Sequence, residues 1–170
     1  MLTELEGAIL SEIHHRGEQT AFKVRRSFAA SPSLEWSGSA GAVYGAIKRL
    51  EREGLLTARA TGDGRATRLL ALTPKGVAAM FAWACDPARA ASVGIDPFRM
   101  RAGIWLGLDA ERRRAVTAEI KAALEASVAA HQAFSRNRDA IERASIDLSL
   151  RLQQVRLDWL RELSAAADGG

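Results

Sequence analysis

The residues best suited to chemistry in this 170-residue chain are cationic and concentrated in one region. Ten lysines and arginines lie between positions 20 and 76 against four acidic residues, whereas the whole chain has a formal net charge of only +4. Clustered cations attract polyanions, above all the phosphates of a nucleic acid. The alternative is a solvated surface on which these cations pair with glutamates at helical spacing. The region therefore predicts a polyanion-binding surface, with the solvated surface as the alternative.

The segment 41–56 must position three of these cations. Its apolar residues Val43, Ile47 and Leu50 recur at i, i+4 and i+7, which predicts a helix with one packed face. Lys48, Arg49 and Arg52 project from the rest of its surface. Gly54 follows where a left-handed C-terminal cap is expected. The segment is typical of a helix that enters a DNA groove.

The elements around this helix have a recognisable order. Helices are expected over 3–15 and 20–30 before it, with Thr20 as the N-cap candidate of the second. A hairpin follows, with its turn at Gly62-Asp63-Gly64. Thr73 and Pro74 then fit the N-cap and first position of another helix, in which we expect Val77, Met80, Phe81 and Ala84 to be buried. This order predicts a mainly α chain that begins with a winged helix-turn-helix, made of three helices plus a two-stranded wing.

Short motifs in this region resemble those of the PadR family of transcriptional regulators. The matching residues are Tyr44, Arg49-Leu50-Glu51, Glu53-Gly54-Leu55, Gly64-Arg65 and Leu72-Thr73-Pro74-Lys75-Gly76. The chain departs from the family at Ala21-Phe22, where Gly-Tyr is usual, and around Leu69 and Leu70, where the wing tyrosine is replaced. The resemblance implies a DNA-binding transcriptional regulator, and specifically a repressor, although no residue encodes the choice between repression and activation. A cytoplasmic location is expected for a separate reason: no apolar run is long enough to span a bilayer, and the N-terminus is acidic where a signal peptide would be basic.

The second half of the chain is predicted to be all-helical. We expect a DNA-binding domain over 1–85, a linker over 86–97 and a helical dimerisation domain over 98–170. Asp109 is a good N-cap for a long helix, and a last helix is expected over about 139–164. Asp96-Pro97-Phe98, Leu108 and Trp159-Leu160 resemble the C-terminal domain of longer PadR-like regulators related to virulence activators. That resemblance implies a homodimer joined by antiparallel packing of C-terminal helices.

The last helix has an apolar band too wide for one neighbour to cover. The predicted dimer-interface residues form one stripe of this band: Ile141, Leu148, Leu152, Val155 and Trp159. A second stripe, with Ile146, Leu150, Leu157, Leu160 and Leu163, lies beside it. Two long helices in a hairpin would leave one stripe uncovered, and a second copy of the chain is the expected cover.

A dimer of this kind would place two copies of the 41–54 helix in successive major grooves of a pseudo-palindromic site. The predicted DNA-binding residues are Lys23, Ser37, Ser39, Ala42, Tyr44, Lys48, Arg49, Arg65, Arg68 and Lys75. Ser37, Ser39 and Ala42 would lie nearest the base edges, and Arg65 at the wing tip would enter the minor groove. Tyr44 could instead be a core aromatic residue, and Arg49 could instead pair with Glu53 at i,i+4.

Tryptophan is abundant in this chain, with four residues. Flat aromatic walls suit a pocket for a planar molecule, and Trp105 is the residue we select for contact with a small aromatic effector. Core packing is the alternative explanation. A different class of function is also open: a winged-helix ligand sensor or protein adaptor that does not bind DNA.

Other function classes lack the residues they need. The sequence has no phosphate-binding G-x-x-x-x-G-K-[ST], no G-x-S-x-G and no H-E-x-x-H, so neither an enzyme nor a cofactor is predicted. His14 and His15 are adjacent and would point in different directions on a helix, so no metal site is predicted. Cys85 is expected to be a small buried thiol. No apolar run approaches the roughly 20 residues that span a bilayer, and no membrane association is expected.

Overall fold

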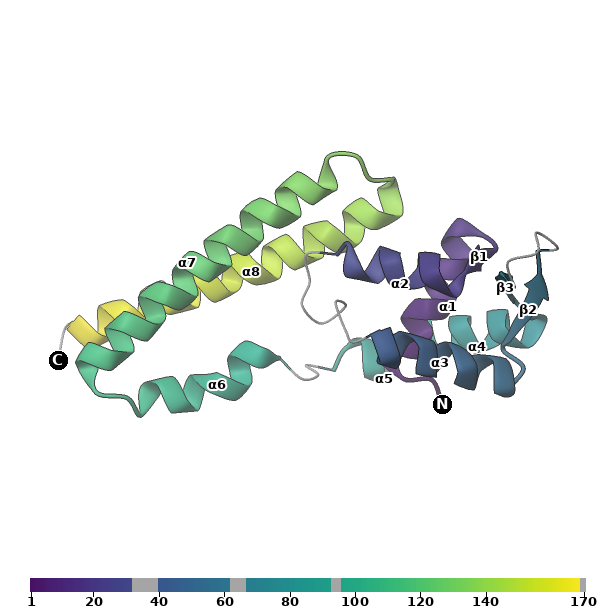
Figure 1. Ribbon diagram of the computed structural model, residues 1–170. Coiled ribbons are helices and arrows are strands. Elements are labelled where there is room, and N and C mark those ends of the chain that lie inside the picture. Colours follow the sequence, from purple (N-terminus) through teal and green to yellow (C-terminus); the bar gives the residue numbers. More distant parts are fainter. Residues whose placement is uncertain (32–39, 62–66, 93–95, 169–170) are drawn as a thin grey trace. The chain divides into compact units, whose positions relative to one another are not determined.

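The computed structural model describes residues 1–31, 40–61, 67–92 and 96–168 (Figure 1). The chain divides into two compact units, Met1–Ser92 and Val93–Gly170. Each unit has its own hydrophobic core. Within the described residues, no helix is both long and apolar enough to span a membrane.

The first unit contains five helices and three short strands among its described residues. In chain order these are α1 Glu4–Arg16, β1 Gln19–Thr20, α2 Ala21–Ala29, α3 Ala40–Arg52, β2 Leu56–Ala60, β3 Arg68–Leu72, α4 Pro74–Ala84 and α5 Pro87–Ala90. β2 and β3 pair antiparallel, with Leu56 opposite Leu72, and form the expected wing. β1 adds a third strand on the other edge of β3, so the predicted two-stranded wing is part of a three-stranded sheet. A two-residue strand has no alternation from which it could be predicted.

Local capping chemistry explains where several helices begin. The Thr20 hydroxyl accepts a hydrogen bond from the Lys23 N–H, and the Thr73 hydroxyl accepts one from the Gly76 N–H, as the sequence predicts. α1 begins with a reciprocal capping box between Thr3 and Glu6. After α3 the chain turns at Gly54, whose φ of 69° lies in the left-handed region that glycine tolerates. These caps fix the ends of the helices that present the candidate site.

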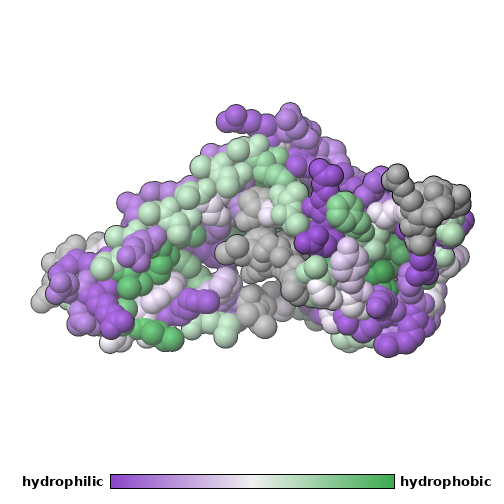
Figure 2. All heavy atoms as spheres, in the orientation of Figure 1, coloured by the Kyte–Doolittle hydropathy of each residue, from purple (hydrophilic) through white to green (hydrophobic). Residues whose placement is uncertain are grey.

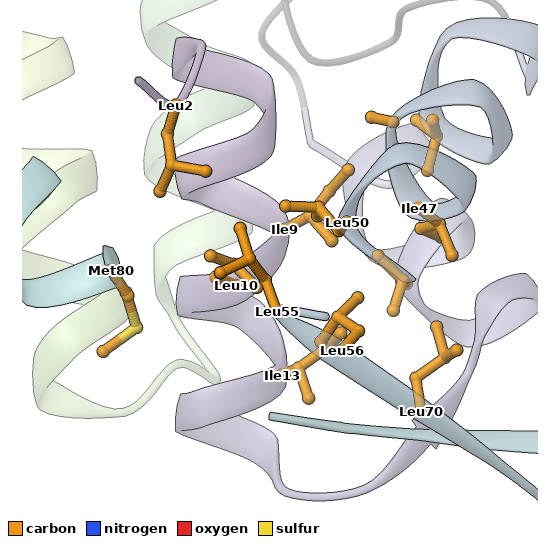
Figure 3. Close-up of a cluster of buried hydrophobic side chains, with 13 residues drawn as sticks. Leu2, Ile9, Leu10, Ile13, Ile47, Leu50, Leu55, Leu56, Leu70 and Met80 are labelled. Atoms are coloured by element: carbon orange, nitrogen blue, oxygen red, sulfur yellow. The ribbon is translucent and has the colours of Figure 1, made fainter. Parts of the chain in front are cut away.

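The core of the first unit surrounds α1 (Figure 3). Ile9 and Leu10 on α1 are completely buried, and Figure 3 shows them beside Leu50 of α3 and Leu55 at the start of the sheet. The predicted apolar stripe of α3 is confirmed, because Val43, Ile47 and Leu50 are all at most 4% exposed. This packing leaves the opposite side of α3 at the surface.

The buried face of α4 differs from the prediction. Gly76 and Met80 are buried, with Ala79 and Trp83 packed against the core, whereas Phe81 and Ala84 are exposed and Val77 is half-buried. Steric fit explains the choice of face, because a Cβ on Gly76 would lie 2.0 Å from the Leu55 carbonyl oxygen. Only glycine permits α4 to approach the chain this closely. The Gly76 face therefore packs, and the stripe beside it faces outward.

The prediction of a buried Cys85 is wrong. Cys85 is exposed and is the C-terminal cap of α4, where its N–H donates to the Phe81 carbonyl. Cys85 follows the exposed Phe81 by four residues, so it lies below the outward-facing stripe of α4. The predicted linker 86–97 also contains structure: Asp86 caps the single-turn helix α5, and Asp96 caps the next helix.

The second unit is all-helical in its described residues. It contains α6 Pro97–Leu106, α7 Ala110–Ser135 and α8 Ala140–Asp168, and α7 and α8 form an antiparallel hairpin (Figure 1). Asp109 caps α7 as predicted, through a 2.8 Å bond from the Arg112 N–H. The fold class expected from the sequence is therefore observed, with a winged helix-turn-helix followed by a helical unit.

Candidate nucleic-acid interface

The exposed side of α3 has a simple composition along its length. Gly41, Gly45, Lys48 and Arg52 recur at spacings of four, three and four residues, on the side opposite the buried stripe. Gly41 and Ala42 are exposed in the first turn. The first half of this side is therefore nearly without side chains and the second half is cationic. A helix of this shape can approach a groove closely with its N-terminal half while its C-terminal half meets phosphates.

Lys48 and Arg52 remain available for a ligand. Both are exposed, and neither side chain is ion-paired within the described part of the chain. Lys23 is also exposed, in the first turn of α2. Among the residues that the structure describes, no carboxylate is in direct contact with these three cations.

Arg49 has a partner that the sequence does not reveal. Its Nε donates to Glu6 Oε1 at 2.8 Å, so the pair joins α3 to α1. The alternative prediction, a pair between Arg49 and Glu53, is wrong. Burial by itself would raise the pKa of Glu6, but hydrogen bonds from Thr3 and Arg49 outweigh it and hold the pKa below its usual value. Glu6 is therefore a buried carboxylate that stays ionised.

Two other predicted contact residues also have partners within the unit. Arg68 on β3 lies 3.5 Å from Glu51 of α3, a separation typical of a weak surface pair. Lys75 Nζ donates to the Glu53 carbonyl oxygen at 2.8 Å, so it ties the start of α4 to the end of α3. This bond uses one of the three N–H donors of the Lys75 ammonium, so the other two could still bind a phosphate.

Tyr44 lies in a shallow groove of about 350 Å³ between α2, α3 and β3. Phe22, Lys48 and Arg68 line the same groove, and Phe22 is 57% exposed. Tyr44 itself is half-buried, so its ring packs while it remains reachable from the surface. The groove combines two aromatic rings with two cations, which suits contact with the sugar-phosphate backbone. Nothing in the sequence pattern places Phe22 in this group.

Three predicted DNA-contact residues, Ser37, Ser39 and Arg65, lie outside the described residues. So do Trp36 and the predicted wing turn at Gly62-Asp63-Gly64. The roles of these residues remain predictions.

The predicted dimer stripe on α8 is mostly at the surface. Four of its members are between 51% and 65% exposed: Ile141, Leu148, Leu152 and Val155. The α7–α8 contact instead uses the neighbouring stripe, in which Ile146, Leu157 and Leu160 are buried. In Figure 2 green apolar residues and purple hydrophilic residues both reach the surface of this hairpin. The second unit thus leaves four large apolar side chains of α8 exposed, as the width of the band predicts.

Trp159 differs from the rest of that stripe because it is half-buried beside the core of its own unit. Its ring lies 5.6 Å from Phe98 and 6.4 Å from Trp105, measured between ring centroids. Trp105 is only 8% exposed and packs edge-on against Phe98 at 4.8 Å. A ligand could reach the Trp105 ring only by displacing one of these neighbours.

A chain of polar contacts runs beside this aromatic cluster and was not predicted. Gln153 of α8 donates to the Ser127 hydroxyl of α7 at 3.0 Å, and Arg156 donates to Gln153 at 3.0 Å. Arg156 also pairs with Asp96, the N-cap of α6. Burial alone would raise the pKa of Asp96, but the bonds from the Arg99 N–H and from Arg156 lower it below its usual value. Nothing in the local sequence pattern indicates these long-range pairs.

The described residues contain no group of three or more histidine, cysteine, aspartate or glutamate side chains that could hold a metal ion. His14 is exposed and packs edge-on against Phe81, with 5.7 Å between ring centroids.

Comparison with known proteins gives matches among solved structures. No family model matches the sequence, and no curated protein matches it either. Bacillus subtilis PadR in complex with operator DNA is similar with a TM-score of 0.78 and 18% identity, over 98% of this chain and 99% of that one. The Vibrio cholerae virulence activator AphA gives 0.75 and 22%, again over 98% and 99%. B. subtilis PadR with p-coumaric acid gives 0.76 and 18%, over 96% and 98%.

Since these matches extend over nearly the whole chain, both units share the architecture of these proteins. The chain has the fold of the PadR-like winged-helix regulators, which is the fold that the resemblance in residues 44–76 implies. At these levels of identity the likeness is one of fold.

Proposed function

We propose that this chain is a cytoplasmic, sequence-specific regulator of transcription that binds double-stranded DNA as a homodimer. The exposed side of α3 is the observation that carries the proposal. Its small residues Gly41 and Gly45 precede Lys48 and Arg52 on one helix side, Ala42 is exposed in the same first turn, and neither cation is ion-paired within the described residues. We propose that this side enters a major groove. Tyr44 and Arg68, which line the groove beside α3, and Lys23, which is exposed in the first turn of α2, are the proposed contacts to the DNA backbone.

The uncovered stripe of α8 supports the homodimer. Four large apolar side chains in one row on a water-exposed helix are unfavourable unless another surface covers them. A second copy supplies an identical stripe, and two-fold symmetry then pairs the two α3 helices. The proposed binding site on DNA is accordingly a pseudo-palindrome whose half-sites are about one helical turn apart.

Selection of duplexes from a random pool on the purified protein tests this proposal. We expect enrichment of a symmetric site with half-sites about 10 base pairs apart. The matched control is the double variant Lys48→Glu/Arg52→Glu, which keeps the buried face of α3 and reverses its exposed charge. It should enrich nothing above background. If the wild-type protein also enriches nothing, the proposed function is wrong.

The proposal includes repression of the bound promoter and release by a small aromatic effector. The p-coumaric acid complex of B. subtilis PadR, a protein of the same fold, supports the effector. Trp105 is the residue of this chain that we select for contact, and ligand entry must open its packing against Phe98. We expect phenolic acids to quench the tryptophan fluorescence of the wild type. The Trp105→Phe variant should show no such quenching. Addition of the quenching compound should also release DNA, and unchanged fluorescence across such compounds would count against an effector of this class.

A further inference from the structure

The Glu6 carboxylate links the start of α1 to the exposed helix α3. Its Oε2 accepts the Thr3 N–H at 2.9 Å, and its Oε1 accepts Arg49 Nε at 2.8 Å. Glu6 is only 7% exposed, whereas the side chain of Arg49 is 44% exposed. The carboxylate is therefore held at both oxygens inside the unit, while part of its arginine partner remains at the surface.

The surface part of Arg49 lies along the side of α3 that would meet DNA. The bond to Glu6 uses Nε, and no other described residue binds the N–H groups of Nη1 and Nη2. Nη1 lies beside Gly45, because a Cβ built on that glycine would be 3.7 Å from it. Gly45 belongs to the same helix side as Lys48 and Arg52. Arg49 thus bends from the edge of α3 toward its exposed side.

We infer that Glu6 is a positioning residue that holds the Arg49 guanidinium in the orientation in which its outer nitrogens bind a DNA phosphate. The inference rests on the proposed function and adds to it a residue that does not touch DNA itself. A free arginine loses much rotational freedom when it binds a phosphate, whereas an arginine already fixed at Nε loses less. The buried carboxylate therefore strengthens a contact that Arg49 makes.

Simple charge counting predicts the opposite effect. Removal of a negative charge from the protein should strengthen its attraction to a polyanion, so on that basis Glu6→Gln should bind DNA more tightly. Positioning predicts weaker binding. The sign of the change therefore separates the two explanations.

Glu4 provides the matched control. It is in the same first turn of α1, and it pairs with Arg89 at 2.7 Å rather than with a residue of α3. Glu4→Gln removes the same charge from the same helix and leaves Arg49 untouched. This variant should bind DNA as the wild type does or slightly more tightly.

The test measures the dissociation constant of the full-length variants for the selected duplex over a range of salt concentrations. Arg49→Ala should weaken binding about tenfold and make the salt slope shallower by about 0.9. Glu6→Gln should weaken binding about threefold or more. Arg49→Ala should then reduce the affinity for DNA less in the Glu6→Gln variant than it does in the wild type. Thermal melts identify any variant that fails to fold.

Arg49→Lys tests the inference without any change at Glu6. Lysine keeps the charge but has neither an Nε donor nor a planar fork, so it cannot be held in the same way. It should bind nearly as weakly as Arg49→Ala.

Two results would overturn the inference alone: a folded Glu6→Gln that binds as tightly as Glu4→Gln, or an Arg49→Lys that binds as tightly as the wild type. Failure of the wild type to bind any duplex would instead remove the proposed function, and the positioning role would fall with it.

Discussion

At the scale of single residues, the cations of the first unit fall into groups with different contacts. Lys48 and Arg52 are unpaired in the described part of the chain, Arg49 is held by a buried carboxylate, and Lys75 is bonded to a backbone carbonyl. A count of positive charges treats these residues as equal. Their contacts indicate that they would contribute differently to the binding of a polyanion.

Lys48→Ala should weaken binding to specific and random duplexes alike, because an unpaired exposed lysine contacts phosphate without reading sequence. The salt slope should fall by about one unit. Arg65→Ala should instead cost about 1 to 3 kcal/mol on the specific site if this wing residue reads a minor groove. Titrations by fluorescence anisotropy on both duplexes measure these effects. Equal losses for both variants on both duplexes would remove the distinction between the two roles.

The lowered pKa of Glu6 predicts how stability depends on pH. In the unfolded chain the Glu6 carboxyl has a pKa of 4.5 and begins to bind a proton near that pH. In the folded protein its pKa is lower, so the carboxylate is still ionised at the same pH. Its stabilising contribution is therefore complete above about pH 4.5 and is lost as the pH falls through the lower folded-state value. Glu6→Gln should consequently show a smaller loss of melting temperature between pH 6 and pH 3 than Glu4→Gln. Parallel curves for the two variants would contradict this expectation.

At the scale of elements, the close approach of α4 to the Leu55 backbone, just before β2, depends on Gly76. Gly76→Ala should destabilise the protein by about 1 to 3 kcal/mol, because its Cβ would have to displace the Leu55 backbone. Gly45→Ala is the control: its Cβ meets only ordinary contact at 3.7 Å, and alanine favours a helix. This control should be as stable as the wild type or more stable. Chemical denaturation measures the free energy of unfolding of both variants. Equal values would contradict the prediction, because α4 could then move away from Leu55 at little cost.

Element positions could largely be predicted from the sequence, because capping and periodicity are local. Thr20, Thr73, Gly54 and Asp109 each mark a helix end that the structure confirms. Which of two adjacent apolar stripes would pack could not be predicted. Both stripes of α4 and both stripes of α8 are apolar, and the choice depends on neighbours distant in the sequence.

Contacts between residues distant in the sequence also explain which features of the candidate site could not be predicted. Arg49 and Glu6 are 43 residues apart, so only the fold brings them together. The local alternative, Glu53 at i,i+4, was the partner that spacing could suggest. Phe22 was likewise recognised only as a replacement in a motif, whereas the structure places it in a groove with Tyr44.

At the scale of the whole molecule, the exposed stripe of α8 predicts a dimer that should dissociate when charged residues are substituted into the stripe. Leu148→Glu/Leu152→Glu would bury two carboxylates per copy in an apolar contact, which is strongly unfavourable. Light scattering should then give a mass near the 18.3 kDa of one chain, against twice that for the wild type. Gln154→Glu, on another side of α8, should leave the dimer intact. A wild-type protein that is monomeric at micromolar concentration would contradict the prediction.

The Thr3–Glu6 capping box has a practical consequence for anyone who prepares this protein. The backbone N–H of Thr3 holds one oxygen of the carboxylate whose other oxygen holds Arg49. Proteolytic trimming before Glu4 would therefore loosen the contact between Glu6 and Arg49, which lies 43 residues further along the chain. Preparations with ragged amino termini should show mixed affinities for DNA even when every molecule is folded, and intact mass measurement before titration would expose the cause.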